Sequence, residues 1–101
     1  MSILQSPRIY QFFDDRLLIS WVLTQPSNNP PLFDVKIKLQ ANPPIVFVPP
    51  QSDVIEISEI NKSKIIINWV IKKPQMKTII KLFLSCNLLD DERELVYSPS
   101  A

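Results

Sequence analysis

The sequence contains no glycine and no histidine, and these two absences exclude several kinds of site. A P-loop or a dinucleotide-binding turn needs glycine where the backbone closes around phosphate. Histidine is the commonest general base and a frequent metal ligand, so its absence removes Ser-His-Asp and Cys-His catalysis. We therefore expect a protein that is not an enzyme and that needs no cofactor.

Cysteine is scarce as well, because Cys86 is the only one. A single thiol can form neither an intramolecular disulfide nor a structural zinc site, which favours a reducing compartment and a cytoplasmic location. The N-terminus lacks the basic and apolar regions of a signal peptide. Asn68, Lys81 and proline pairs interrupt the apolar stretches, so we expect no membrane span.

The length of 101 residues suits one domain, which we expect to span residues 8–97 between a lead-in at 1–7 and a tail at 98–101. Eleven basic and ten acidic residues leave the chain nearly neutral. A near-zero net charge argues against the uniform basic field of a nucleic-acid binder.

Alternating apolar residues predict strands throughout the chain. In Lys64–Lys72 one face would carry only apolar side chains, and the other face mixes Ile66 and Val70 with Asn68. This mixture predicts an interior strand whose second face is partly covered. Arg16–Thr24 has the same character, and both tryptophans fall on faces predicted to point into the core, which comprise Leu17, Ile19, Trp21, Leu23, Ile65, Ile67, Trp69 and Ile71.

Phe33–Gln40 alternates most regularly, and it predicts a strand with one exposed face. Phe33, Val35, Ile37 and Leu39 would point inward, opposite Asp34, Lys36, Lys38 and Gln40. Thr78–Cys86 would turn Ile80, Leu82, Leu84 and Cys86 inward. Shorter strands are predicted at Arg8–Phe13, Ile45–Val48, Asp53–Ile57 and Glu94–Tyr97.

The turns must form without glycine, so asparagine is expected to supply the left-handed backbone positions. The candidates are Asn28, Asn29, Asn42 and Asn61. The proline pairs at 43–44 and 49–50 enclose Ile45–Val48, and because proline lacks a backbone donor this run is predicted to be an edge strand or a crossing between sheets. Asn87–Arg93 is predicted to be an acidic loop, although Asp90–Leu95 could instead form a single helical turn.

These features predict an all-β immunoglobulin-like antiparallel β-sandwich of seven or eight strands. The run Asn-Pro-Pro-Ile-Val-Phe-Val-Pro-Pro (42–50), followed by the long strand that ends at Lys-Lys-Pro (72–74), resembles CARDB-like, adaptin-appendage (ear) and major-sperm-protein-like domains. The similarity covers about residues 16–86, with Asn29 and Asn61-Lys62 where those families often have glycine. It implies a binding or scaffolding module.

Two acidic clusters are candidates for binding Ca²⁺ if their loops meet at one end of the sandwich. One is Asp14-Asp15, and the other is Asp90-Asp91-Glu92 with Glu94. Neither cluster has the ligand spacing of a known calcium motif, so solvated loop charge is the preferred interpretation.

The leading functional hypothesis is a non-enzymatic module that binds a protein or peptide through an edge strand or a lysine-bearing sheet face. The candidate partner-binding residues are Lys36, Lys38, Ile45, Phe47, Lys72 and Lys73. One alternative is a subunit that assembles with copies of itself. Another is a small nucleic-acid binder in which Tyr10 and Phe12 stack on bases beside the lysines.

Overall fold

The structure is a computed structural model that describes residues 3–25 and 30–99, and within these ranges every regular element is a β-strand. The prediction of an all-β fold is therefore confirmed. The strands are β1 (Ile3–Leu4), β2 (Arg8–Phe12), β3 (Arg16–Thr24), β4 (Leu32–Asn42), β5 (Val54–Ile60), β6 (Lys64–Lys72), β7 (Thr78–Ser85) and β8 (Asp90–Tyr97).

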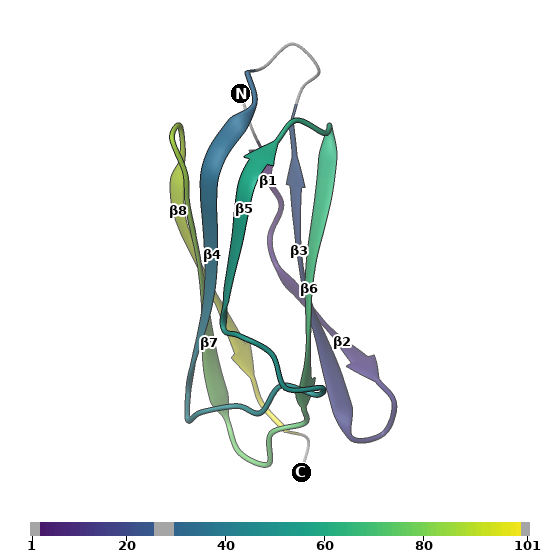
Figure 1. The fold of residues 1–101 in the computed structure, drawn as a ribbon. Helices are drawn as coiled ribbons and strands as arrows, with labels where there is room; N and C mark the ends of the chain where they lie inside the picture. The colour runs from purple at the N-terminus through teal and green to yellow at the C-terminus, as the bar shows by residue number, and fades with distance from the viewer. Residues whose placement is uncertain (1–2, 26–29, 100–101) are drawn as a thin grey trace.

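The strands form two antiparallel sheets that face each other, as Figure 1 shows. In sheet A, β3 lies in the middle, with β6 on one side and with β1 and β2 in succession along the other. Sheet B has the order β5-β4-β7-β8. This arrangement matches the two sheets of an immunoglobulin-like sandwich, with β5 added to the sheet that contains β4, β7 and β8.

The core lies between the sheets, and its side chains follow the alternation of the central strands. Trp21 and Trp69 are both fully buried, as predicted, and Cys86 packs partly buried against the core. Ile65 is only partly buried. The buried apolar residues are Leu17, Ile19, Trp21, Leu23, Leu32, Val35, Ile37, Leu39, Ile60, Ile67, Trp69, Ile71, Ile80, Leu82 and Leu84.

The alternation predicted for Phe33–Gln40 is wrong at Phe33. Phe33 is 43% exposed, and the preceding Leu32 is buried in its place. Asp34 has a φ of 54°, which interrupts the extended backbone so that Phe33 and Asp34 both point outward. From Val35 onward the predicted inward series is confirmed.

The prediction that asparagines supply the left-handed backbone positions is also wrong for the two candidates that the structure describes. Asn42 and Asn61 have ordinary φ values, whereas Phe13 (61°) and Asp34 (54°) have positive ones. Asn28 and Asn29 lie outside the described residues. Aspartate tolerates this conformation better than most residues, but a bulky aromatic residue such as Phe13 is strained in it.

The acidic segment after β7 is a strand rather than a loop. β8 begins at Asp90 and pairs with β7 along its whole length, from Ser85 opposite Asp90 to Thr78 opposite Tyr97. The turn between β7 and β8 lies at the opposite end of the sandwich from the turn between β2 and β3, which contains Asp14 and Asp15 (Figure 1). A calcium site shared by the two acidic clusters is therefore ruled out.

β6 is an interior strand over only part of its length. One side pairs with β3 from Lys64 to Lys72, but the other side contacts only a short segment around Phe47. On the second face, Val70 is partly buried but Ile66 is 53% exposed, so the predicted partial cover is found only near Val70.

Candidate functional site

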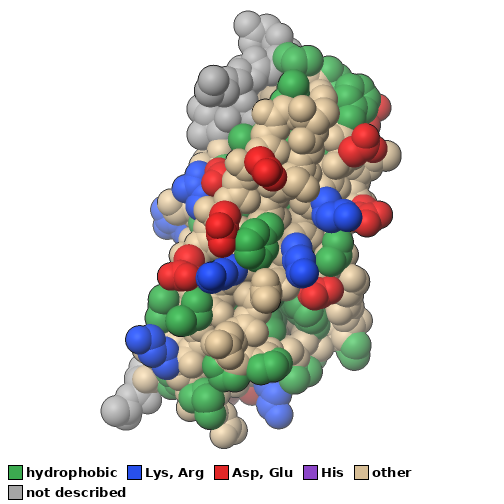
Figure 2. Space-filling view, turned by 90° about the vertical axis from the view of Figure 1, so that its left-hand side faces the viewer, with side chains coloured by type: hydrophobic (Ala, Val, Ile, Leu, Met, Phe, Trp, Pro, Cys, Tyr) green, Lys and Arg blue, Asp and Glu red, His purple; other side chains and the backbone are tan. Residues whose placement is uncertain are grey.

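The six predicted binding residues are distributed over both sheets. Lys36 and Lys38 point outward from β4 on sheet B, where Lys36 Nζ lies 4.0 Å from Glu56 Oε1. Lys38 lies opposite Phe83 of β7. Figure 2 shows this side of the molecule, on which acidic, basic and hydrophobic side chains are intermixed.

Ile45 and Phe47 belong to the proline-flanked segment, which lies beside the edge of sheet A. The predicted short strand is wrong, because this segment forms only one isolated bridge, between Phe47 and Ile71. The Val48 amide donates to the Val70 carbonyl at 3.0 Å, and the Lys72 amide donates to the Val46 carbonyl at 2.8 Å. Ile45 and Phe47 are partly buried against the core. Their side chains therefore anchor the segment to the core, while Val46, which is 59% exposed, faces solvent.

Lys72 and Lys73 lie at the end of β6, next to the turn between β2 and β3. Lys72 is paired with Arg16, and the Lys73 amide donates to the Asp15 carbonyl at 2.8 Å. Both lysines are thus held by the sheet A backbone, on the opposite sheet from Lys36 and Lys38.

The outer face of sheet A carries an apolar row that crosses the sheet. Tyr10 lies opposite Leu18, and Leu18 lies opposite Val70, which is in turn bonded through its carbonyl to Val48. Tyr10 is 48% exposed, and the other three side chains are partly exposed. The outer face of an antiparallel sheet is usually polar, so this row departs from the normal pattern.

Basic residues border the apolar row, and the strands of sheet A contain no acidic residue. Their charged residues are Arg8, Arg16, Lys64 and Lys72. Sheet B is the reverse, because its strands carry a majority of acidic residues, namely Asp34, Glu56, Glu59, Asp90, Asp91, Glu92 and Glu94, against Lys36, Lys38, Lys81 and Arg93. The nearly neutral chain therefore folds into one basic sheet and one acidic sheet.

An aromatic pair stands at the end of this basic face. The Phe12 and Phe13 rings lie 4.7 Å apart, and the Arg16 guanidinium carbon lies 5.8 Å from the centre of the Phe13 ring. Phe13 is 67% exposed, and its backbone has a positive φ. Strained backbone that holds an apolar side chain in solvent is more common at binding surfaces than elsewhere.

The depressions on the surface are shallow. One of about 490 Å³ lies between β4 and β5 and is lined by Asp34, Val35, Lys36, Glu56, Ile57 and Ser58. Another of about 430 Å³ lies along the edges of β5 and β6. Within residues 3–25 and 30–99, no three His, Cys, Asp or Glu side chains are grouped so that they could hold a metal ion, and no helix is long and apolar enough to cross a membrane.

The outer face of sheet A was not predicted from the sequence as a site. Tyr10 and Phe12 were expected only as stacking residues of a nucleic-acid binder, and Leu18 and Val70 only as residues opposite the core. A usable signal was present, because the segments Arg8–Phe13, Arg16–Thr24 and Lys64–Lys72 contain no Asp or Glu. What the sequence does not reveal is that these three segments are neighbours in one sheet.

No protein-family profile matches the chain, and no curated protein matches it. Among solved structures, the chain is similar to the GAE domain of GGA2p from Saccharomyces cerevisiae. The TM-score is 0.40 with 14% sequence identity, over 99% of this chain and 89% of that chain. The GAE domain is an adaptin-appendage domain, one of the three families that the strand pattern resembles. The match says nothing about what this chain binds.

Proposed function

We propose that this domain is a non-enzymatic interaction module that binds an acidic, partly apolar segment of another protein on the outer face of sheet A. The observation that supports it most is the combination of an exposed apolar row with basic neighbours and no acidic residue in the same strands. Exposed apolar surface bordered by charge is typical of protein-binding sites.

The apolar and basic residues have different tasks in this proposal. Tyr10, Leu18 and Val70 offer the partner a surface on which apolar side chains lose contact with water. Arg16 and Lys72, which are adjacent across β3 and β6, attract acidic side chains and exclude basic ones. Of the residues predicted from the sequence, Lys72 belongs to this surface, Lys73 follows it directly after β6, and Ile45 and Phe47 pack beneath its edge.

The proposal is tested with a fluorescently labelled synthetic peptide of alternating glutamate and leucine, compared with the same peptide carrying lysine in place of glutamate. We expect only the acidic peptide to bind. Arg16→Glu combined with Lys72→Glu should weaken binding by about tenfold or more, since two favourable charges become repulsive. Lys36→Glu combined with Lys38→Glu is the matched control, because it makes the same charge change on sheet B.

The outcomes separate the two faces. Unchanged binding by the Arg16/Lys72 variant, or no binding of the acidic peptide to the wild-type protein, would overturn the proposal. Loss of binding only in the Lys36/Lys38 variant would instead assign the interaction to the lysines of sheet B.

A second candidate function, binding of single-stranded nucleic acid, is favoured by one observation on the same face. Tyr10 and Phe12 are exposed on β2 next to Arg8 and Arg16. Single-stranded nucleic acid binds to such surfaces because bases stack on the aromatic rings and phosphates contact the basic residues. A labelled oligothymidine should then bind in fluorescence anisotropy with an affinity that falls as salt rises. No binding at low salt would exclude this function.

A further inference from the structure

The edge of β6 from Lys64 to Asn68 has backbone groups that no described segment pairs. The proline-flanked segment bonds only to the Val70 carbonyl and the Lys72 amide. Backbone groups alternate in direction along a strand, so the N–H and C=O of Ile66 and Asn68 point toward this same edge. β6 is bonded on its other side to β3, which leaves this half of the strand as an open edge of sheet A.

The other sheet edges carry features that oppose pairing with another chain. β8 is rich in acidic residues and turns the charged pair Asp91 and Arg93 toward the interior. β5 carries Glu56 and Glu59, and Pro7 interrupts the edge formed by β1 and β2. Natural proteins use charges, prolines and interruptions of this kind to protect sheet edges.

The open edge of β6 has no proline and no inward-pointing charge, and between Lys64 and Asn68 it exposes an isoleucine. Ile66 is 53% exposed on the outer face, and Ile65 is only partly buried on the inner one. A depression of about 430 Å³ runs beside it and includes Ile57, Ile60, Ile65 and Ile66 among its lining residues. A strand added at this edge would cover both isoleucines.

We propose that two copies of this chain associate by antiparallel pairing of their β6 strands about a two-fold axis at Ile66. In this register Ile66 faces Ile66 of the second copy, and Lys64 faces Asn68 of the second copy. All of these residues have backbone groups directed to the edge, so they form hydrogen-bonded pairs. Apolar side chains meet each other and no two like charges are opposed.

The second copy is the occupant because the edge is self-complementary. An acidic segment would find Lys62 and Lys64 here with Glu59 beside them, whereas the strands of sheet A carry no acidic residue on their outer face. A symmetric pairing of β8 would oppose acidic residues in both copies. Pairing through β6 joins the two A sheets into one continuous sheet and leaves the outer faces of both copies open, so the proposal does not rest on the peptide-binding function.

The test is sedimentation velocity of the purified protein from low micromolar to millimolar concentration. We expect a monomer–dimer equilibrium, and Ile66→Lys should raise the dissociation constant at least tenfold, because it opposes two lysines on the axis. Val96→Lys is the matched control, since Val96 is 51% exposed on the outer face of sheet B. The control should dimerise like the wild type.

A second variant keeps the test decisive if Ile66→Lys does not fold. Hydrogen-bonded residues of antiparallel strands have Cα atoms about 5.5 Å apart, within the range that a disulfide bridges. In a Cys86→Ser background, Ile66→Cys should therefore form a covalent dimer under mild oxidation and Val96→Cys should not. A wild-type protein that stays monomeric at every concentration, or equal cross-linking of the two cysteine variants, would overturn the proposal.

Discussion

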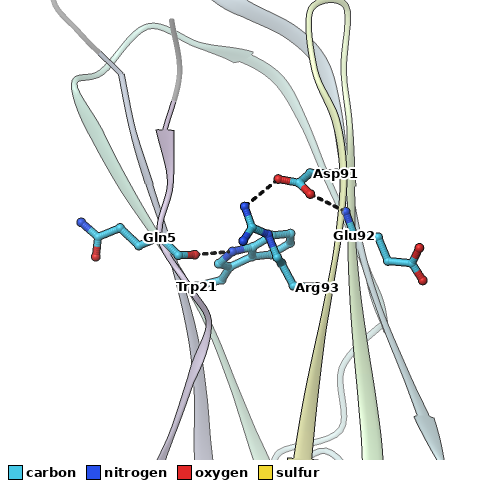
Figure 3. A network of polar contacts seen from close by, with 5 residues as sticks. All are labelled: Gln5, Trp21, Asp91, Glu92 and Arg93. Carbon is cyan, nitrogen blue, oxygen red and sulfur yellow. Dashed lines mark hydrogen bonds and ion pairs between the residues drawn. The ribbon is translucent and has the colours of Figure 1, made fainter.

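The indole Nε1 of Trp21 donates a hydrogen bond of 2.9 Å to the backbone carbonyl of Gln5 (Figure 3). Gln5 lies between β1 and β2, where the edge of sheet A is interrupted. The bond therefore anchors the segment between these two strands to a buried core residue. The second buried tryptophan differs, because Trp69 Nε1 has no hydrogen-bond partner among the described residues.

This difference predicts unequal costs for the same substitution. Trp21→Phe leaves the Gln5 carbonyl without its donor, whereas Trp69→Phe removes a buried donor that is unpaired. Both changes remove a similar volume, so the difference in the free energy of unfolding isolates the hydrogen bond. Trp21→Phe should cost about 1 kcal/mol more than Trp69→Phe in urea denaturation. Equal costs would show that the bond contributes nothing to stability.

The positive φ of Asp34 predicts a strong dependence on the residue type at this position. Asp34→Val should lower the free energy of unfolding by about 1–2 kcal/mol, because a β-branched side chain is strained in the left-handed region. Asp34→Asn should be nearly neutral. Lys36→Val, an outward position of the same strand with ordinary backbone, serves as the control in thermal denaturation and should change stability little.

The pair Asp91 and Arg93 predicts an effect on stability. Arg93 Nη2 lies 2.9 Å from Asp91 Oδ2, and both side chains are mostly shielded from solvent. In Figure 3 both belong to β8, and the Arg93 side chain extends toward the interior of the sandwich. Asp91→Ala should destabilise the protein by about 1 kcal/mol, since it leaves a partly buried cation unpaired.

Replacing both members of this pair predicts a different result. Asp91→Leu combined with Arg93→Leu should restore most of the stability, because an apolar pair replaces a partly buried ionic one. The same change removes inward charges that protect the β8 edge, so light scattering should report more association at high concentration. A double variant as unstable as Asp91→Ala would contradict this account.

Two isoleucines of β6 should respond differently to truncation. Ile71 is fully buried, and Ile71→Ala should cost about 2–5 kcal/mol through lost burial and the cavity it leaves. Ile66 is 53% exposed, and in the monomer Ile66→Ala should change stability by less than about 0.5 kcal/mol. Denaturation at low protein concentration measures both. Similar costs would mean that the edge of β6 is covered in the monomer.

Much of the fold could be predicted because the central strands have one wholly apolar face. β3 and β6 begin and end at the predicted residues, since Arg16–Thr24 and Lys64–Lys72 alternate without interruption. β4 was predicted less well because the reversal at Phe33 depends on the backbone angle of Asp34, which the pattern of side chains does not encode. Glu94–Tyr97 was predicted as a strand, but the first half of β8 was mistaken for a loop because acidic side chains suit both a solvated loop and an exposed edge strand.

The candidate site could be predicted only in part. The lysines were recognised, but Lys36 and Lys38 lie on sheet B while Lys72 lies on sheet A, next to Arg16. Which charges share a face depends on which strands pair. Those pairings join segments far apart in the chain, such as Leu18 and Val70.

The all-β fold follows from the amino acids alone, because alternation decides locally which side chains turn inward, and the lack of histidine excludes histidine-based catalysis. The tertiary structure decided where charge gathers and which edge is open. Both depend on long-range strand pairing: the basic strands β2, β3 and β6 become neighbours only in sheet A. The segment around Phe47 pairs with β6 no further than Val70, which leaves the edge beside the exposed Ile66 open.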